Sequence, residues 1–187
     1  MEFVNFLHIK ILEYADVYMS CGVQILFLSV PLLFNRSKPF KKEDESKLNT
    51  REASRAVLFD ENNLIPLLFV SKYNHHKLQR GGIDLEEDKE KALIRECLEE
   101  IGCEIKILSE VGKIIEYRKE WALKQISYCY LGKIISKGKS NFTEEEIHDG
   151  FKVLWVSIQD AISMVEKDKP TIAKETNFSI VYCSFAI

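Results

Sequence analysis

The sequence predicts a domain of the α+β class with a mixed β-sheet. Three features of residues 51–169 predict it: apolar runs typical of strands outnumber the helical segments, the helices fall irregularly among the strands, and no internal repeat is present. The chain has 187 residues. A chain of this length buries about 70% of its unfolded surface and needs no disulfides or metals to fold. One domain with an N-terminal appendage accounts for the length.

The first expected elements are a hairpin and a helix. Two apolar runs, residues 56–59 and 64–70, are separated by the turn-forming sequence DENN. Pro66 lies in the second run and indicates an edge strand or a bulge, because proline donates no backbone hydrogen bond. Residues 88–101 are rich in Glu, Lys, Leu and Ala, which favours a helix.

The second half of the domain is expected to contain strands and one more helix. Its apolar runs predict four strands, at residues 105–108, 112–117, 125–135 and 152–156. A helix is predicted over residues 157–167, before Pro170. The stretch after Pro170 carries no assignable element.

Composition excludes several classes of protein. Hydrophobic residues make up 46% of the chain, and 26 basic residues nearly balance 29 acidic ones, for a net charge of −3. This excludes overall disorder and the strongly basic surface of a protein that wraps nucleic acid. The five cysteines are scattered and form no CxxC pair. We therefore expect no disulfide framework and no cysteine zinc site, and we expect a reducing, cytoplasmic location.

The N-terminal region differs from the rest. Residues 17–35 contain no charged side chain and are just long enough to span a membrane, although Ser20, Gln24, Ser29 and Pro31 weaken the stretch. Basic residues follow it, which would place its C-terminal side in the cytoplasm. Three interpretations stay open: a weak membrane anchor, an element packed on the domain, or an extension that is not part of the working protein. The expected organisation is an extension (1–35), a charged linker (36–50), the domain (51–169) and a C-terminal tail (170–187).

The segment GGIDLEEDKEKALIRECLEEIGC, residues 81–103, carries the functional signal. On a helical wheel three carboxylates, those of Glu96, Glu99 and Glu100, share one side with Ala92. The opposite side is expected to face the core and carries Ile94, Cys97, Leu98 and Ile101. Like charges at this spacing repel, and a hard divalent cation such as Mg²⁺ would offset the repulsion.

The alternative interpretation of these glutamates is a solvated acidic helix face. Two glycine signals favour a site instead. Gly81 and Gly82 allow the backbone to approach a bound ion or phosphate closely, and Gly102 ends the helix directly after the glutamate pair.

The same segment resembles the Nudix box, the signature of the Nudix hydrolase family. The box is a glycine, five residues, a glutamate, seven residues and then R-E-U-x-E-E-x-G-U, where U is aliphatic; here Cys97 and Cys103 occupy the U positions. With each fixed residue at about 7% usage, a chance match is on the order of 10⁻⁸ per starting position. All seven fixed positions are filled, by Gly81, Glu87, Arg95, Glu96, Glu99, Glu100 and Gly102.

The resemblance implies a Nudix-type α/β/α sandwich with a mixed β-sheet. It also implies that activated water cleaves the diphosphate bond of a nucleoside diphosphate linked to another moiety, with Mg²⁺, or Mn²⁺, as cofactor. The roles that it implies are metal ligation by Glu96, Glu100 and the Gly81 carbonyl, a third ligand or base from Glu99, orientation of the glutamates by Arg95, and support from Glu87, Gly82 and Gly102.

A further base is expected outside the box. In several Nudix enzymes a glutamate from an opposite loop supplies the base or another metal ligand, and the run Thr143-Glu-Glu-Glu lies in a suitable place. Glu145 is the candidate, and the alternative is an acidic helix start capped by Thr143.

The approach to the box leaves a second function open. Many relatives have a proline and a glycine where this chain has Gln79 and Arg80. This favours a catalytically weak Nudix-like domain that binds a nucleotide as a sensor, whereas the intact glutamates favour the enzyme. The expected partner is a nucleotide-type small molecule such as ADP-ribose or a nucleoside triphosphate, with no nucleic acid. Membrane contact is expected only through residues 17–35, and the sequence is compatible with a homodimer.

Overall fold

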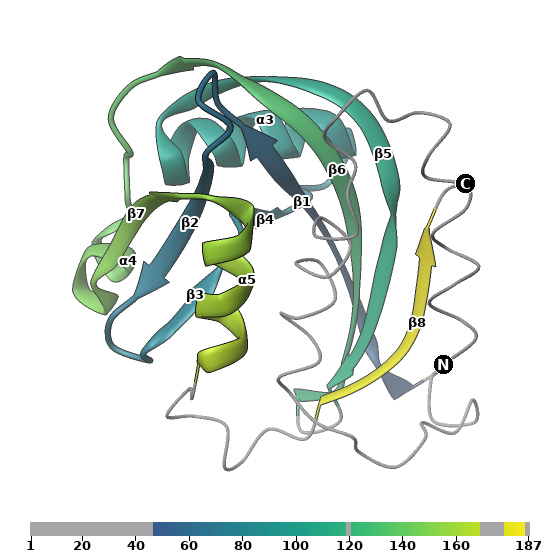
Figure 1. Cartoon of the computed structure of the whole chain (residues 1–187). Helices are drawn as coiled ribbons and strands as arrows, with labels where there is room; N and C mark the ends of the chain where they lie inside the picture. Colours follow the sequence, from purple (N-terminus) through teal and green to yellow (C-terminus); the bar gives the residue numbers. More distant parts are fainter. Residues whose placement is uncertain (1–46, 119–120, 169–177, 186–187) are drawn as a thin grey trace, which may run out of the picture.

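The computed structural model describes residues 47–118, 121–168 and 178–185 (Figure 1). Within them two β-sheets form the central layer: a five-stranded sheet in the order β4-β1-β6-β5-β8 and a three-stranded sheet in the order β3-β2-β7. In chain order the elements are β1 (Asn49–Phe59), β2 (Ile65–Val70), β3 (His75–Lys77), β4 (Arg80–Gly82), α3 (Lys89–Ile101), β5 (Cys103–Arg118), β6 (Leu123–Lys137), α4 (Glu144–Asp149), β7 (Phe151–Val156), α5 (Ile158–Lys167) and β8 (Phe178–Phe185).

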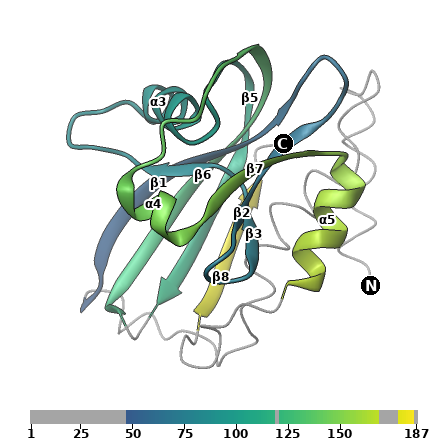
Figure 2. The ribbon, with the colours of Figure 1, turned by 90° about the vertical axis from the view of Figure 1, so that its left-hand side faces the viewer.

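The larger sheet is mixed, as expected. Strands β1 and β6 pair in parallel over their full shared length, whereas β4 pairs with β1, and β5 pairs with β6 and with β8, in antiparallel fashion. The helices α3 and α5 lie on opposite sides of the strands (Figure 2). The predicted α+β class, with a mixed β-sheet between helices, is therefore confirmed.

Two hydrophobic clusters hold the layers together, one on each side. Side chains alternate between the faces of a strand, so Val57 packs toward α5 while its neighbour Leu58 packs toward α3. In the same way Leu67 belongs to the α5 cluster and Leu68 to the α3 cluster. Strands buried on both faces explain why these runs are continuously apolar instead of alternating.

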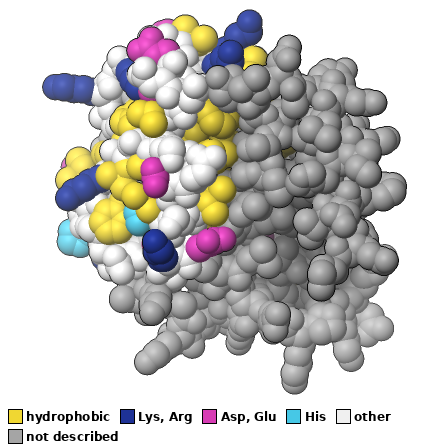
Figure 3. All heavy atoms as spheres, viewed as in Figure 1, with side chains coloured by type: hydrophobic (Ala, Val, Ile, Leu, Met, Phe, Trp, Pro, Cys, Tyr) yellow, Lys and Arg dark blue, Asp and Glu magenta, His cyan; other side chains and the backbone are white. Residues whose placement is uncertain are grey.

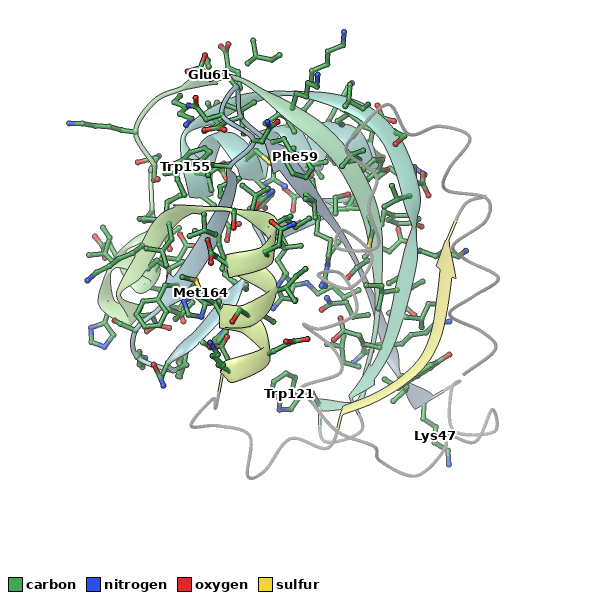
Figure 4. The ribbon with its side chains drawn as sticks, viewed as in Figure 1. Lys47, Phe59, Glu61, Trp121, Trp155 and Met164 are labelled. Carbon is green, nitrogen blue, oxygen red and sulfur yellow. The ribbon has the colours of Figure 1, made fainter. Side chains whose placement is uncertain are left out.

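The predicted hairpin at residues 56–70 is wrong in its pairing. The turn itself forms, at the place where Figure 4 labels Glu61, and the Asp60 carboxylate accepts hydrogen bonds from the backbone N–H groups of Asn62 at 2.9 Å and Leu64 at 2.8 Å. However, β1 and β2 enter different sheets. Local turn chemistry fixes the reversal of the chain, whereas the partner of each strand depends on distant segments.

Pro66 lies in the middle strand of the smaller sheet, where it is opposite Trp155 of β7. The other neighbour, β3, pairs with β2 only from Leu68 to Val70. On its β3 side Pro66 therefore has no strand partner among the described residues. It lies at a local sheet edge, where its lack of a backbone N–H donor breaks no ladder hydrogen bond.

The remaining predicted strands form with longer bounds than expected, whereas each of the two predicted helices begins one residue later. The runs at residues 105–108 and 112–117 form one strand, β5, whose pairing with β6 is interrupted by three register shifts. Helices α3 and α5 lie where they were expected, and α5 is capped by Ser157, which accepts from the N–H of Asp160 at 3.1 Å. Strand β8 adds to the sheet edge from a stretch to which the sequence assigned no element.

The apolar stretch at residues 17–35 lies outside the described residues. Within the described ranges, no helix is long and apolar enough to cross a membrane. Cys97 and Cys103 are buried free thiols, and Cys129 is buried as well. On the face in Figure 3, hydrophobic and charged side chains of the described residues are interspersed.

Candidate active site

Helix α3 is held in place at both ends. At its start the Asp88 carboxylate accepts hydrogen bonds from the backbone N–H groups of Glu90 and Lys91, and the Ser54 hydroxyl of β1 donates to the Lys89 carbonyl at 2.6 Å. At its end Gly102 adopts φ 66°, a left-handed conformation that favours glycine. A Cβ there would also collide with the backbone of Lys139. The predicted stop at Gly102 is confirmed.

The buried face of α3 differs from the predicted face. Its buried residues are Ala92, Leu93, Cys97, Glu100 and Ile101, so Cys97 and Ile101 were predicted correctly. Ile94 and Leu98 were not, because they are 45% and 53% exposed. The wheel argument assumed that the three glutamates face solvent together. The helix is instead rotated so that Glu100 is buried.

Glu100 can be buried because two donors satisfy it. One carboxylate oxygen lies 3.0 Å from the ammonium of Lys77, and the other accepts the backbone N–H of Arg80 at 2.8 Å. The side chains of Lys77 and Glu100 are 16% and 4% exposed. Burial raises the pKa of Glu100, and Lys77 opposes that shift. Burial also lowers the pKa of Lys77. Lys77 was not predicted from the sequence.

Arg95 gathers the other glutamates of the box. Its guanidinium donates to both oxygens of Glu87, at 3.0 and 2.9 Å, and to the Gly82 carbonyl at 3.1 Å. It also donates to Glu96 at 2.7 Å and to Glu99 at 3.4 Å. The hydrogen bonds from Arg95 lower the pKa of Glu87 to about 2. Arg95 thus connects the loop before α3 to the acidic face of the helix.

Glu96 lies directly against the glycine that opens the box. A Cβ on Gly81 would overlap the Glu96 side chain, so only glycine permits this approach. Burial raises the pKa of Glu96, and its hydrogen bond from Arg95 acts in the opposite direction. Glu99 is 48% exposed and is the most open of the three helix carboxylates.

Gln79, which precedes the box, has a defined structural role. Gln79 is completely buried, and its amide donates to the Ala56 carbonyl of β1 at 2.9 Å. This bond ties the loop to the larger sheet. The backbone is therefore fixed here by a hydrogen bond where many relatives have proline.

Comparison with known proteins identifies the family. A family model described as NUDIX domain matches residues 49–176, which is more than half of the chain. The chain belongs to the NUDIX domain family. It is a hydrolase that acts on phosphorus-containing anhydrides, and membership implies a nucleotide-type small-molecule substrate.

Solved Nudix structures share the fold at low sequence identity. A MutT protein from Methanosarcina mazei Go1 is 19% identical with a TM-score of 0.50, over 63% of this chain and 84% of that chain. An Ap4A hydrolase from C. elegans is 20% identical with a TM-score of 0.48, over 62% and 86%. The likeness to the MutT protein shows the fold alone. No match was found among curated proteins.

Nudix hydrolases generally use divalent metals such as Mg²⁺, and the donors of this Nudix chain suit such an ion. Carboxylate and carbonyl oxygens are the ligands that Mg²⁺ prefers, and Gly81 leaves room for the Glu96 carboxylate. Within the described residues, however, no three acidic, histidine or cysteine side chains are grouped to hold a metal. Glu96 and Glu100 are held by protein cations instead, Arg95 and Lys77.

A glutamate outside the box also acts on this site. The backbone N–H of Asn141 donates to the Glu99 carbonyl at 2.7 Å, which ties the segment before α4 to α3. Thr143 and Glu146 form a reciprocal capping box at the start of α4, and Glu145 is exposed. After burial and the attraction to Lys77, the charge of Glu146 contributes to the raised pKa of Glu100. Glu145 was the candidate predicted from the TEEE run, whereas Glu146 was not singled out.

Proposed function

We propose that this Nudix hydrolase is a Mg²⁺-dependent pyrophosphohydrolase that cleaves the diphosphate bond of a nucleoside diphosphate linked to another moiety. The observation that carries the proposal is the arrangement around Arg95, which brings Glu87, Glu96 and Glu99 together beside Gly82. A solvated acidic helix face does not require a shared, partly buried guanidinium or a glycine pressed against one carboxylate.

The box residues have distinct roles in this proposal. Glu96 and Glu100 hold the cation together with the Gly81 carbonyl, and Glu99 is the third ligand or the base. A bound Mg²⁺ neutralises phosphate charge and activates water for attack. Arg95 orients the glutamates, because its bidentate bond to Glu87 keeps the guanidinium in place when a carboxylate turns.

The loop that opens the box is built to keep its shape. Glu87 accepts the backbone N–H of Asp84 at 3.1 Å in addition to Arg95, and Gln79 fixes the preceding backbone to β1. Positioning of this kind matters because polyanionic substrates are cleaved by placed charges more than by covalent chemistry. Glu145 stays the candidate for a base outside the box.

A substrate panel tests the proposal. The full-length protein is incubated with ADP-ribose, nucleoside triphosphates, dinucleoside polyphosphates and nucleotide sugars, with Mg²⁺ or with excess chelator, and the nucleotide products are separated. The proposal predicts cleavage at a diphosphate bond with Mg²⁺ only. Tight nucleotide binding without turnover would instead support the sensor interpretation.

A further inference from the structure

The two least exposed glutamates of the box are paired with different protein cations. Glu96 is paired with Arg95, whereas Glu100 is paired with Lys77, which comes from β3 and not from the box. A carboxylate that is 4% exposed is stable only when a charge or several donors compensate its lost hydration. Lys77 provides that charge.

The two cations are anchored differently. Arg95 also binds both oxygens of Glu87 and the Gly82 carbonyl, so it would keep most of its hydrogen bonds if Glu96 turned to a metal. The Lys77 ammonium donates its hydrogen bond to Glu100. Its ammonium also lies 4.4 Å from the centroid of the Phe151 ring, which can retain a cation that has released its carboxylate.

We propose that Lys77 is an internal competitor for the metal at Glu100: its ammonium neutralises Glu100 in the metal-free protein and must release that carboxylate when a divalent cation binds. The inference rests on the proposed metal role of Glu100. Lys77 thereby lowers the affinity for metal and keeps Glu100 in place until metal arrives. It is a positioning residue that acts through Glu100.

The direction in which Lys77→Gln changes the affinity for metal shows whether Lys77 competes with the metal or only supports Glu100. If Lys77 competes, Lys77→Gln removes the competitor and metal binds more tightly. If Lys77 only supports Glu100, the same change loosens the carboxylate and metal binds more weakly. The expected tightening is about 2- to 150-fold, the range in which contacting side chains couple.

Calorimetric titration of the full-length protein with Mn²⁺ alone measures the effect, and the Mn²⁺-induced rise in melting temperature gives a second readout. Lys77→Arg keeps the charge and should bind no more tightly than the unmodified protein. Lys72→Gln is the matched control, because Lys72 pairs with Asp149 at 2.6 Å outside the box. It should leave Mn²⁺ affinity unchanged.

Unchanged or weaker Mn²⁺ binding by Lys77→Gln would overturn the inference. Should that variant fail to fold, nitrogen NMR of the lysine ammonium groups in the unmodified protein decides: added Mg²⁺ should shift the Lys77 signal and spare that of Lys72, and an unmoved Lys77 signal would overturn the inference. Failure of the proposed function looks different, since the unmodified protein would then bind no Mn²⁺.

Discussion

Replacing either Glu96 or Glu100 by glutamine should strongly reduce turnover. The two single variants should differ in their free energy of unfolding. Losing a ligand or base typically costs about 10²–10⁴-fold in turnover. Glu100 is 4% exposed and faces Lys77 at 3.0 Å. Removing one partner of a buried pair costs about 3–5 kcal/mol. Glutamine keeps the shape and can still accept from Arg80, so we expect about 2 kcal/mol for Glu100→Gln.

In Glu96→Gln the cation that loses its charged partner is Arg95, which has other hydrogen-bond partners. Arg95 keeps Glu87 and the Gly82 carbonyl, and burial already disfavours the charged form of Glu96 by raising its pKa. We expect a change within about 0.5 kcal/mol.

Thermal unfolding followed by circular dichroism in chelator measures both variants. At about 2–4 °C per kcal/mol for a chain of this size, Glu100→Gln should melt about 4–8 °C below the unmodified protein, and Glu96→Gln within about 2 °C of it. If Glu100→Gln melted as high as Glu96→Gln, the assignment of Lys77 and Glu100 as a stabilising buried pair would be refuted.

Three further predictions concern the fold. Leu93→Ala should cost about 2–5 kcal/mol because Leu93 is fully buried, whereas the exposed Leu98→Ala should cost under about 0.5 kcal/mol; equal urea midpoints would contradict the observed helix face. Burial pushes the pKa of Asp60 up, but hydrogen bonds from Lys137 and two backbone N–H groups lower it below 3.8. The stability that the Asp60 carboxylate contributes is therefore fully present above its ordinary pKa and is lost as the pH falls through the lowered pKa. Asp60→Asn should destabilise the protein at pH 7, and the difference in melting temperature should shrink as the pH is lowered into the acid range; a difference that does not change with pH would contradict this. A shortened chain that begins at Lys47 should fold and keep the activity, because the family match starts at residue 49; an insoluble or inactive product would show that residues 1–46 belong to the fold.

Local signals in the sequence predicted most elements. The end of α3 followed from Gly102, whose capping role depends on its neighbours along the chain, whereas the Asp88 cap at the start of α3 was not predicted. Strand pairing did not follow, because β1 pairs with β6, about 75 residues away in sequence, and no local feature specifies such a partner. The same limitation explains the wrong hairpin.

The box residues were identified from their spacing, but the burial and the charged partners of their side chains were not predicted. The sequence treated Glu96, Glu99 and Glu100 as one exposed group. Burial of Glu100 depends on Lys77, which is 23 residues earlier in the chain and lies on β3 of the smaller sheet. A single lysine after two histidines carries no motif, so only the tertiary structure reveals the pair. For the same reason Leu98 was assigned to the core when Leu93 belongs there.

The measurement that tests the central claim most directly is nucleotide release by the full-length protein and by Glu96→Gln, with Mg²⁺ and with excess chelator. Leu98→Ala, a change on the exposed side of the same helix, is the matched control. The account predicts Mg²⁺-dependent cleavage of a nucleoside diphosphate derivative by the unmodified protein and by Leu98→Ala, and a loss of at least about 10²-fold in Glu96→Gln. Undiminished turnover in excess chelator, or near-normal turnover by Glu96→Gln, would contradict it.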